Sequence, residues 1–220
     1  MAAGVVLLLG SAAISASSIA YFGDELPPFI LEKLPLPLED VWTLALQVHV
    51  AAAAACLPGC VLLSSSALLR RAPRLHRWLG RATVALLTFA LVPTGFYLSL
   101  FAKGGLPSTL GFVLSGAIVL AGVVQGVRAA RARRYTQHRR WMLHILAQLS
   151  VAVTSRAMLF AFDAAGVDES IAYLVSLWLP VVGSFGLVEL LSIRRKHAAP
   201  VDARHSAVVR APEPGRARAA

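Results

Sequence analysis

Charged side chains are scarce in this chain. They account for 15% of its 220 residues, whereas 57% are hydrophobic. A soluble domain carries about 25% charged residues, so the composition indicates a membrane protein. Cysteine is scarce as well, since Cys56 and Cys60 are the two cysteines of the chain and both lie in one apolar run. Two cysteines four residues apart on one helix form no extracellular disulfide framework, and we interpret them as small packing residues.

Motifs that carry familiar catalytic chemistry are absent too. The chain contains no glycine-rich phosphate loop, no HExxH zinc motif and no Ser-His-Asp arrangement. His49, Cys56 and Cys60 share a helix face, but one helix alone rarely provides a metal site. The sequence therefore identifies no reaction, and we expect a binding or structural protein before an enzyme.

The formal net charge is +10, and the charges are sorted along the chain. Eighteen of the 21 Lys and Arg fall in the segments Arg70–Arg81, Arg128–Arg140 and Arg194–Arg218, whereas nine of the 11 Asp and Glu lie elsewhere. The positive-inside rule produces this pattern. We therefore assign the basic segments to the cytoplasmic side of a multi-pass membrane protein, with anionic lipid headgroups as partners and no nucleic acid.

Six apolar runs are long enough to cross a bilayer. They are Val5–Phe22, Val41–Leu69, Trp78–Phe101, Leu110–Val127, Trp141–Phe162 and Ile171–Ile193. The sequence thus predicts an all-α, polytopic transmembrane bundle of six helices, with both termini inside and a four-helix core made of helices two to five. A kink is expected at Pro58, inside the second run.

The sequence divides into four predicted segments. Residues 1–22 are a retained first helix or a signal peptide, and the lack of Lys or Arg before Val5 favours the helix. Residues 23–40 contain four prolines and five acids, which predicts an exposed acidic outer loop. Residues 41–193 form the transmembrane core. Residues 194–220 lack apolar periodicity and are predicted to be a disordered basic cytoplasmic tail.

Two short segments are alike. LHRWLGR, at residues 75–81, and QHRRWML, at residues 137–143, both place His-Arg and then Trp at the inner entrance of an outward-running helix. Each segment follows an inward-running helix and a basic turn. The sequence therefore indicates a repeat of two similar helical hairpins.

A family resemblance rests on these segments. The sequence elements that carry it, in order, are His49, Gly59, Pro73–Gly80, His138–Met142 and Arg156. In this spacing they resemble a bacterial membrane protein family catalogued as domain of unknown function 2306, over roughly Val48 to Phe160. The resemblance implies a helical fold in the bacterial inner membrane and no established reaction. His144 stands where the family pattern leads one to expect another basic residue.

Two polar residues stand out inside the apolar runs. His49 lies about 10 Å below Trp42, at the outer interface, and Arg156 lies about 10 Å below Asp163. Both therefore fall in one layer of the outer leaflet. A charged side chain within a membrane needs a counter-ion, a carbonyl, water or a ligand. One interpretation is a pocket in which Arg156 holds an anionic or carbonyl group and His49 exchanges a proton. The other is that Arg156 snorkels while His49 bonds a neighbouring carbonyl.

Cations also gather where two helices begin at the inner face. They are His76, Arg77, His138, Arg139 and Arg140. Cations at helix N-termini oppose the helix macrodipole, so another interaction must favour them. Anionic lipid headgroups are one such partner, and a bound anion such as the propionates of haem is the other.

A b-type haem is the cofactor that paired membrane histidines suit. A six-coordinate haem needs two histidines at one depth on facing helices. The outer layer holds His49 alone, whereas the inner layer holds His76, His138 and His144. A two-haem carrier therefore fits poorly, and one inner haem, ligated by His144 with His76 or His138, stays open.

The sequence favours one function and leaves two alternatives. We expect a membrane protein that binds a small molecule or redox cofactor (quinone-like, lipid or anionic) in the layer of His49 and Arg156. The first alternative is a b-type haem electron-transfer protein that uses the inner histidines. The second is a transporter or a non-catalytic structural subunit, although the almost wholly apolar middle layer does not favour a transport path.

Overall fold

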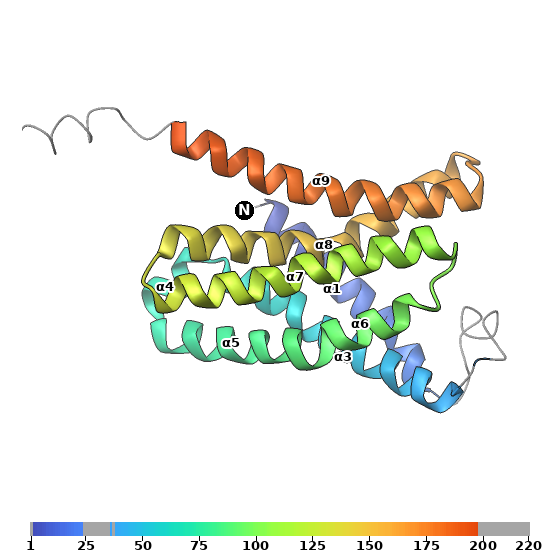
Figure 1. The fold of residues 1–220 in the computed structure, drawn as a ribbon, viewed down its shortest axis with the longest axis horizontal. Coiled ribbons are helices and arrows are strands. Elements are labelled where there is room, and N and C mark those ends of the chain that lie inside the picture. Colours follow the sequence, from blue (N-terminus) through green and yellow to red (C-terminus); the bar gives the residue numbers. More distant parts are fainter. Residues whose placement is uncertain (1, 24–35, 37, 198–220) are drawn as a thin grey trace, which may run out of the picture. The chain divides into compact units, whose positions relative to one another are not determined.

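A computed structural model describes residues 2–23, 36 and 38–197, and all regular secondary structure in these residues is helical. The elements are α1 (Ala2–Ser17), the 3-10 helix η1 (Ser18–Phe22), α3 (Glu39–Leu63), α4 (Ser66–Arg71), α5 (Pro73–Leu86), the π turn η2 (Leu87–Leu91), α6 (Val92–Ser99), α7 (Leu106–Arg131), α8 (Tyr135–Ala164) and α9 (Glu169–His197) (Figure 1). The prediction of an all-α fold is therefore confirmed.

Six helical stretches of the described chain are long and apolar enough to cross a membrane. They are Gly4–Phe22, Glu39–Leu63, Pro73–Ser99, Leu106–Arg131, Tyr135–Ala164 and Glu169–Arg194. Each coincides with one of the six apolar runs, so the prediction of a six-helix polytopic bundle is confirmed. The protein is a membrane protein.

The boundary between the second and third spans differs from the prediction. The second span ends at Leu63, and a separate short helix, α4, follows it. Ser65 explains the break, because its side chain accepts a hydrogen bond from the N–H of Leu68 and caps α4. The third span begins at Pro73 rather than Trp78, since proline is favoured at the first position of a helix. The second span itself runs through Pro58 as a single helix.

The core is built from two helical hairpins. In the first, α3 packs against α5, the π turn and α6; in the second, α7 packs against α8. The buried apolar core joins both hairpins and comprises Ala52, Cys56, Leu87, Leu91, Val92, Val119, Val123 and Ile145. The four-helix core is thus confirmed. Cys56 is fully buried and Cys60 packs against the same cluster, both as free thiols, which agrees with their interpretation as packing residues.

Small residues bring α7 and α8 close together. A Cβ atom on Gly122 would lie 2.8 Å from Cγ1 of Ile145, and one on Gly126 would lie 2.2 Å from Cε of Met142. Carbon atoms in contact are normally 3.5–4.0 Å apart, so neither position has room for a larger residue. The small-xxx-small pair therefore sets the spacing of the second hairpin.

The chain divides into two compact units, residues 1–188 and residues 189–220. In the first unit, α1 packs against α3 and α8, with Gly10 against Val153, and Gln47 Nε2 donates a 3.0 Å hydrogen bond to the carbonyl of Tyr21. In the second unit, the described residues continue α9 to His197. The predicted acidic loop, except for its ends, and the predicted tail beyond residue 197 lie outside the described residues.

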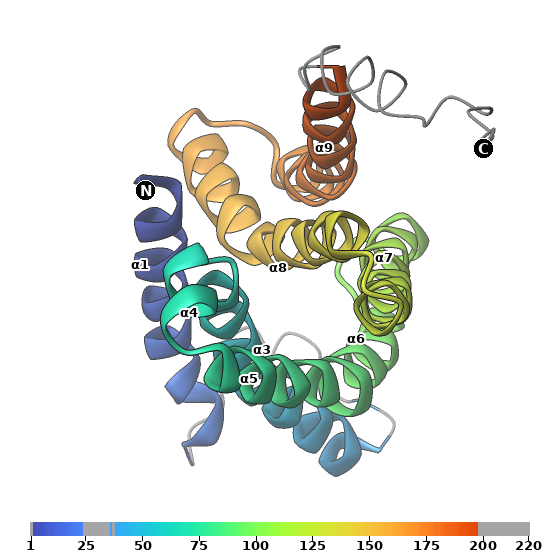
Figure 2. The same ribbon diagram turned by 90° about the vertical axis from the view of Figure 1, so that its left-hand side faces the viewer.

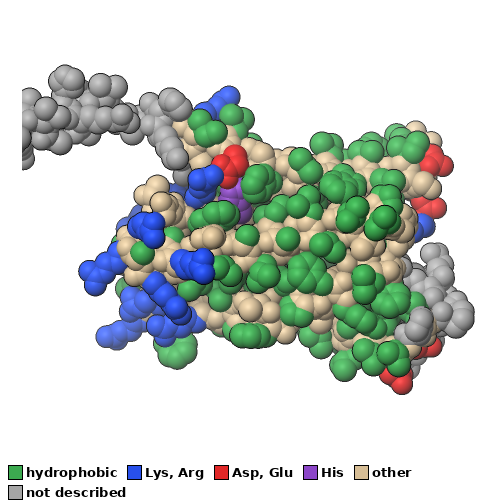
Figure 3. All heavy atoms as spheres, viewed as in Figure 1, with side chains coloured by type: hydrophobic (Ala, Val, Ile, Leu, Met, Phe, Trp, Pro, Cys, Tyr) green, Lys and Arg blue, Asp and Glu red, His purple; other side chains and the backbone are tan. Residues whose placement is uncertain are grey.

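Charge is separated along the bundle. Figure 3 shows Lys and Arg gathered at one end and Asp and Glu mainly at the other. We call the end that carries residues 70–81 and 128–140 the basic end, and the end that carries residues 39–40 and 163–169 the acidic end. This separation agrees with the predicted topology, and the assignment of the basic end to the cytoplasm stays a prediction. Seen end-on in Figure 2, α5 and α8 lie on opposite sides of a ring of helices.

Candidate functional site

The first hairpin contains a π turn, and Pro93 explains its position. Proline has no N–H and cannot continue the α-helical hydrogen-bond pattern. The N–H of Val92 donates instead to the carbonyl of Leu87, five residues back. The Thr94 hydroxyl then donates to the carbonyl of Ala90 at 2.6 Å. Single π turns within α-helices occur frequently at functional sites, and this one lies opposite α3.

His49 projects from α3 onto this turn. Its Nδ1 lies 3.1 Å from the carbonyl oxygen of Leu91 and 3.1 Å from Oγ1 of Thr94. A carbonyl oxygen only accepts hydrogen bonds, so Nδ1 carries the proton and donates it. The neutral imidazole then holds its lone pair on Nε2. No hydrogen bond reaches Nε2 from the described residues, and the side chain is half-buried.

Gly95 keeps the imidazole in this position. A Cβ atom at Gly95 would come within 3.1 Å of Cε1 of His49 and within 3.5 Å of its Nδ1. The ring therefore lies directly on the backbone of α6, and its two hydrogen bonds limit its freedom to move away. His49 is thus an oriented side chain, with one nitrogen anchored and the other available.

Arg156 lies in the acidic-end half of α8. Its Nη1 donates a 2.9 Å hydrogen bond to the carbonyl of Ala152, four residues earlier in the same helix, and the side chain is exposed. Among the described residues, no hydrogen bond or ion pair joins Arg156 to His49. His49 lies ten residues from the start of α3 and Arg156 eight residues from the end of α8, so they share a layer of the bundle but contact different neighbours.

The basic end brings two predicted site residues together. His76 and His138 are each the fourth residue of their helix, α5 and α8. Each backbone N–H donates a 3.0 Å bond to the carbonyl before its helix, that of Ala72 or Arg134. His76 lies within electrostatic range of His138 and of Arg77. The repeat found in the sequence therefore gives the two histidines equivalent positions in their helices.

The other basic-end residues differ in their exposure. Arg77 and Arg139 are exposed, Arg140 is half-buried, and His144 is fully buried. The ring of His144 packs between Trp141, at 5.5 Å between centroids, and Phe185, at 4.7 Å. His144 therefore lies one to two turns deeper in α8 than His138, among aromatic side chains.

A buried polar cluster in the middle of the bundle was not anticipated from the sequence. Ser115 Oγ donates to Gln148 Oε1 at 2.9 Å, and Gln148 Nε2 donates to the carbonyl of Val181 at 3.0 Å and to Ser184 Oγ at 3.1 Å. Gln148 is 3% exposed. The cluster joins α7, α8 and α9, and such bonds hold membrane helices together. The sequence feature that could have revealed this cluster is Gln148, a glutamine in the middle of an apolar run.

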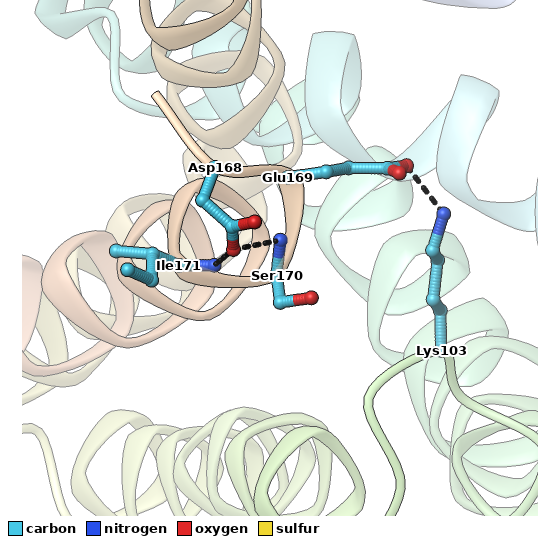
Figure 4. A network of polar contacts seen from close by, with 5 residues as sticks. All are labelled: Lys103, Asp168, Glu169, Ser170 and Ile171. Atoms are coloured by element: carbon cyan, nitrogen blue, oxygen red, sulfur yellow. Dashed lines mark hydrogen bonds and ion pairs between the residues drawn. The ribbon is translucent and has the colours of Figure 1, made fainter. Parts of the chain in front are cut away.

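At the acidic end, polar contacts close the loops. Asp168 Oδ1 accepts hydrogen bonds from the N–H groups of Ser170, at 3.0 Å, and Ile171, at 3.2 Å, and so caps α9. Glu169 pairs with Lys103 from the turn between α6 and α7 (Figure 4). Both partners of this ion pair are exposed, so its contribution to stability is small. It ties the second hairpin to the start of α9.

Comparison with known proteins gives one match. The model of a family described as "Predicted membrane protein (DUF2306)" matches residues 46–192. That range begins in α3, ends in α9 and covers most of the first hairpin and all of the second. No curated protein and no solved structure matches the chain.

Proposed function

This chain belongs to the DUF2306 family of predicted membrane proteins, and we propose that it binds a small, membrane-soluble molecule at His49. The observation that supports this most is the orientation of the imidazole. Its Nδ1 is bound to the carbonyl of Leu91, which leaves Nε2 as a lone-pair nitrogen with no hydrogen bond from the described residues. We further propose a bacterial inner membrane location, with the basic end in contact with anionic lipid headgroups.

The chemistry of Nε2 defines the ligand class. A neutral imidazole nitrogen accepts a hydrogen bond from a hydroxyl or N–H group, and it takes up a proton when the ligand releases one. A quinol or the hydroxyl of a lipid offers such a donor and dissolves in the bilayer. Arg156 lies in the same layer and would attract a carbonyl or anionic group. The two side chains therefore act on separate parts of a ligand, or Arg156 contacts a different molecule.

The alternative to ligand binding is a purely structural histidine. In that case His49 would serve only to donate the hydrogen bond from Nδ1 to the Leu91 carbonyl and Thr94 Oγ1. Asparagine can supply that bond, because its side-chain NH2 group occupies a similar position, but it has no counterpart of Nε2. His49→Asn therefore separates the two roles.

The test is extraction of the molecules that co-purify with the full-length protein in mild detergent, followed by mass spectrometry. We expect at least one lipid or quinone enriched with the wild type and reduced about tenfold or more in His49→Asn, since a lost buried hydrogen bond to a ligand costs about 1.5 kcal/mol. The matched control is Gln47→Leu, two residues away, whose side chain bonds Tyr21 instead. Equal extracts from all three proteins would contradict the proposal.

A further inference from the structure

Arg156 is exposed on the surface of α8, and its side chain turns toward the middle of the span. Its Nη1 donates a hydrogen bond to the carbonyl of Ala152, one helical turn nearer the basic end. Ala152 lies 12 residues before the end of α8, at Ala164, which is about 18 Å along the helix. Half of the hydrocarbon core of a bilayer is about 15 Å thick. The guanidinium therefore lies near the centre of the bilayer, too deep for a lipid headgroup to reach.

The charge of Arg156 is not balanced by the chain itself. A guanidinium has five N–H donors, and Arg156 makes one hydrogen bond and no ion pair among the residues that the structure describes. The sequence explains this, because it contains no Asp or Glu between Asp40 and Asp163. Charged side chains within a span almost always face the bundle interior or a water-filled cavity and pair with another group. Arg156 is exposed instead, so it needs a partner from outside this chain.

The surface that follows Arg156 can accept another helix. Ala157, Phe160 and Ala161 lie on the same side of α8 and are exposed, Phe160 to 78%. Small residues four apart on a membrane helix allow the backbone of a second helix to approach closely, and Ala157 and Ala161 have this spacing. We call Arg156, Ala157, Phe160 and Ala161 the α8 stripe. Its residues are placed so that a helix lying along α8 would contact all four.

A second copy of this chain does not offer the complementary charge. None of the six described spans has an acidic residue at its middle. Those of α3 and α8 lie in the terminal turns. In α9, Glu169 is the first residue and Glu189 follows 20 residues later, about 30 Å along the helix and close to the other end of the span. The partner of Arg156 is therefore a different molecule.

A helix fits the α8 stripe better than a small molecule does. Small-molecule sites are concave and bury most of the surface of their ligand, whereas the four residues of the stripe are exposed on the outside of one helix. A carboxylate accepts two parallel hydrogen bonds from a guanidinium. If that carboxylate belongs to a helix, the same helix also covers the apolar residues beside Arg156.

We propose that the α8 stripe is the docking site for a transmembrane helix of another protein, one that carries an Asp or Glu near the middle of its span. The carboxylate pairs with the guanidinium of Arg156, and the two alanines let the partner helix approach. The proposal does not depend on the ligand of His49, because that side chain bonds Leu91 and Thr94 and not Arg156.

The experiment uses the full chain in phosphatidylcholine vesicles and a synthetic single-span peptide of leucine and alanine. One peptide carries Glu at its centre, and its matched control carries Gln there. Energy transfer from the tryptophans of the protein to a dansyl group on the peptide measures binding. We expect the Glu peptide to bind the wild type at least about tenfold more tightly than the Gln peptide. Arg156→Gln should remove this difference, whereas Arg156→Lys should keep part of it.

Two controls separate this role from the alternatives. His49→Asn should leave binding of the Glu peptide unchanged, so this proposal and the one for His49 can fail independently. Arg156→Leu should not lower the detergent fraction at which the isolated chain unfolds, because its one described bond is within its own helix. The proposal is overturned if both peptides bind the wild type equally, if the preference for Glu survives in Arg156→Gln, or if Arg156→Leu unfolds more readily, which would make Arg156 a packing residue.

Discussion

Replacement of Gly122 by alanine tests the packing of the second hairpin, which carries His138 and Arg156. The new methyl group would lie 2.8 Å from Cγ1 and 3.4 Å from Cδ1 of Ile145, and 3.4 Å from the backbone oxygen of Trp141. Ile145 is 1% exposed and belongs to the main core. Neither neighbour can yield freely, because one is enclosed by the core and the other is backbone.

The magnitude follows from two opposing effects. Normal carbon contacts of 3.5–4.0 Å require the methyl and Ile145 to separate by about 0.7 Å or more, and overpacking of this kind costs about 1–3 kcal/mol. Alanine gains about 1 kcal/mol over glycine in a helix interior. We therefore expect Gly122→Ala to change the free energy of unfolding by between about 0 and −2 kcal/mol.

A matched variant separates the steric clash from the higher helix propensity of alanine. Gly183 lies within α9, and a Cβ atom there would meet nothing within 4 Å. Gly183→Ala therefore gains stability from the higher helix propensity of alanine without a steric clash. The two variants should differ in free energy of unfolding by about 1–3 kcal/mol, which is about 5- to 140-fold in the unfolding equilibrium.

The assay is reversible unfolding in mixed micelles by titration with sodium dodecyl sulfate, followed by tryptophan fluorescence. The midpoint for Gly122→Ala should fall below that for Gly183→Ala, with similar slopes. If both variants unfold at the same detergent fraction, or Gly122→Ala is the more stable, then α7 and α8 do not approach as closely as in this structure.

Two further predictions concern the bundle and its orientation. Gln148→Leu should lower the free energy of unfolding by about 1–2 kcal/mol in the same titration. It removes three hydrogen bonds, and such bonds between membrane helices are worth about 0.6 kcal/mol each. The control Gln125→Leu, on the exposed surface of α7, should not lower the free energy of unfolding. For orientation, an impermeant thiol reagent should label Ala165→Cys in intact cells and Ala132→Cys in inverted vesicles alone. The reverse labelling would show that the basic end faces outward.

The sequence predicted the elements that depend on composition and periodicity. Runs of apolar residues predicted the six spans, and the similar segments around His76 and His138 predicted the two hairpins. The basic segments gave the charge separation. These features follow from the bilayer itself, because span length and loop charge are set by its thickness and its surface potential.

The sequence could not predict which neighbour a polar side chain contacts. Counting residues gives the depth of His49 and Arg156 but not the direction in which they face. The direction of His49 depends on the π turn before Pro93, which changes the register of α6, and no periodicity signals such a turn. Gln148 was passed over because it carries no charge, although an uncharged amide in the middle of a span also needs partners.

Each hairpin contains a histidine whose Nδ1 bonds a backbone carbonyl, and this arrangement bears on function. His49 and His138 each use Nδ1 to reach a carbonyl on the paired helix of their own hairpin, Leu91 or Gly126. A hydroxyl would make that bond with fewer polar atoms to bury. What histidine adds is the second nitrogen, which can hold a proton, a hydrogen bond or a metal. We therefore propose that Nε2 of His49 contacts a ligand, and His49→Asn tests this, because asparagine can keep the bond to Leu91 but lacks that nitrogen.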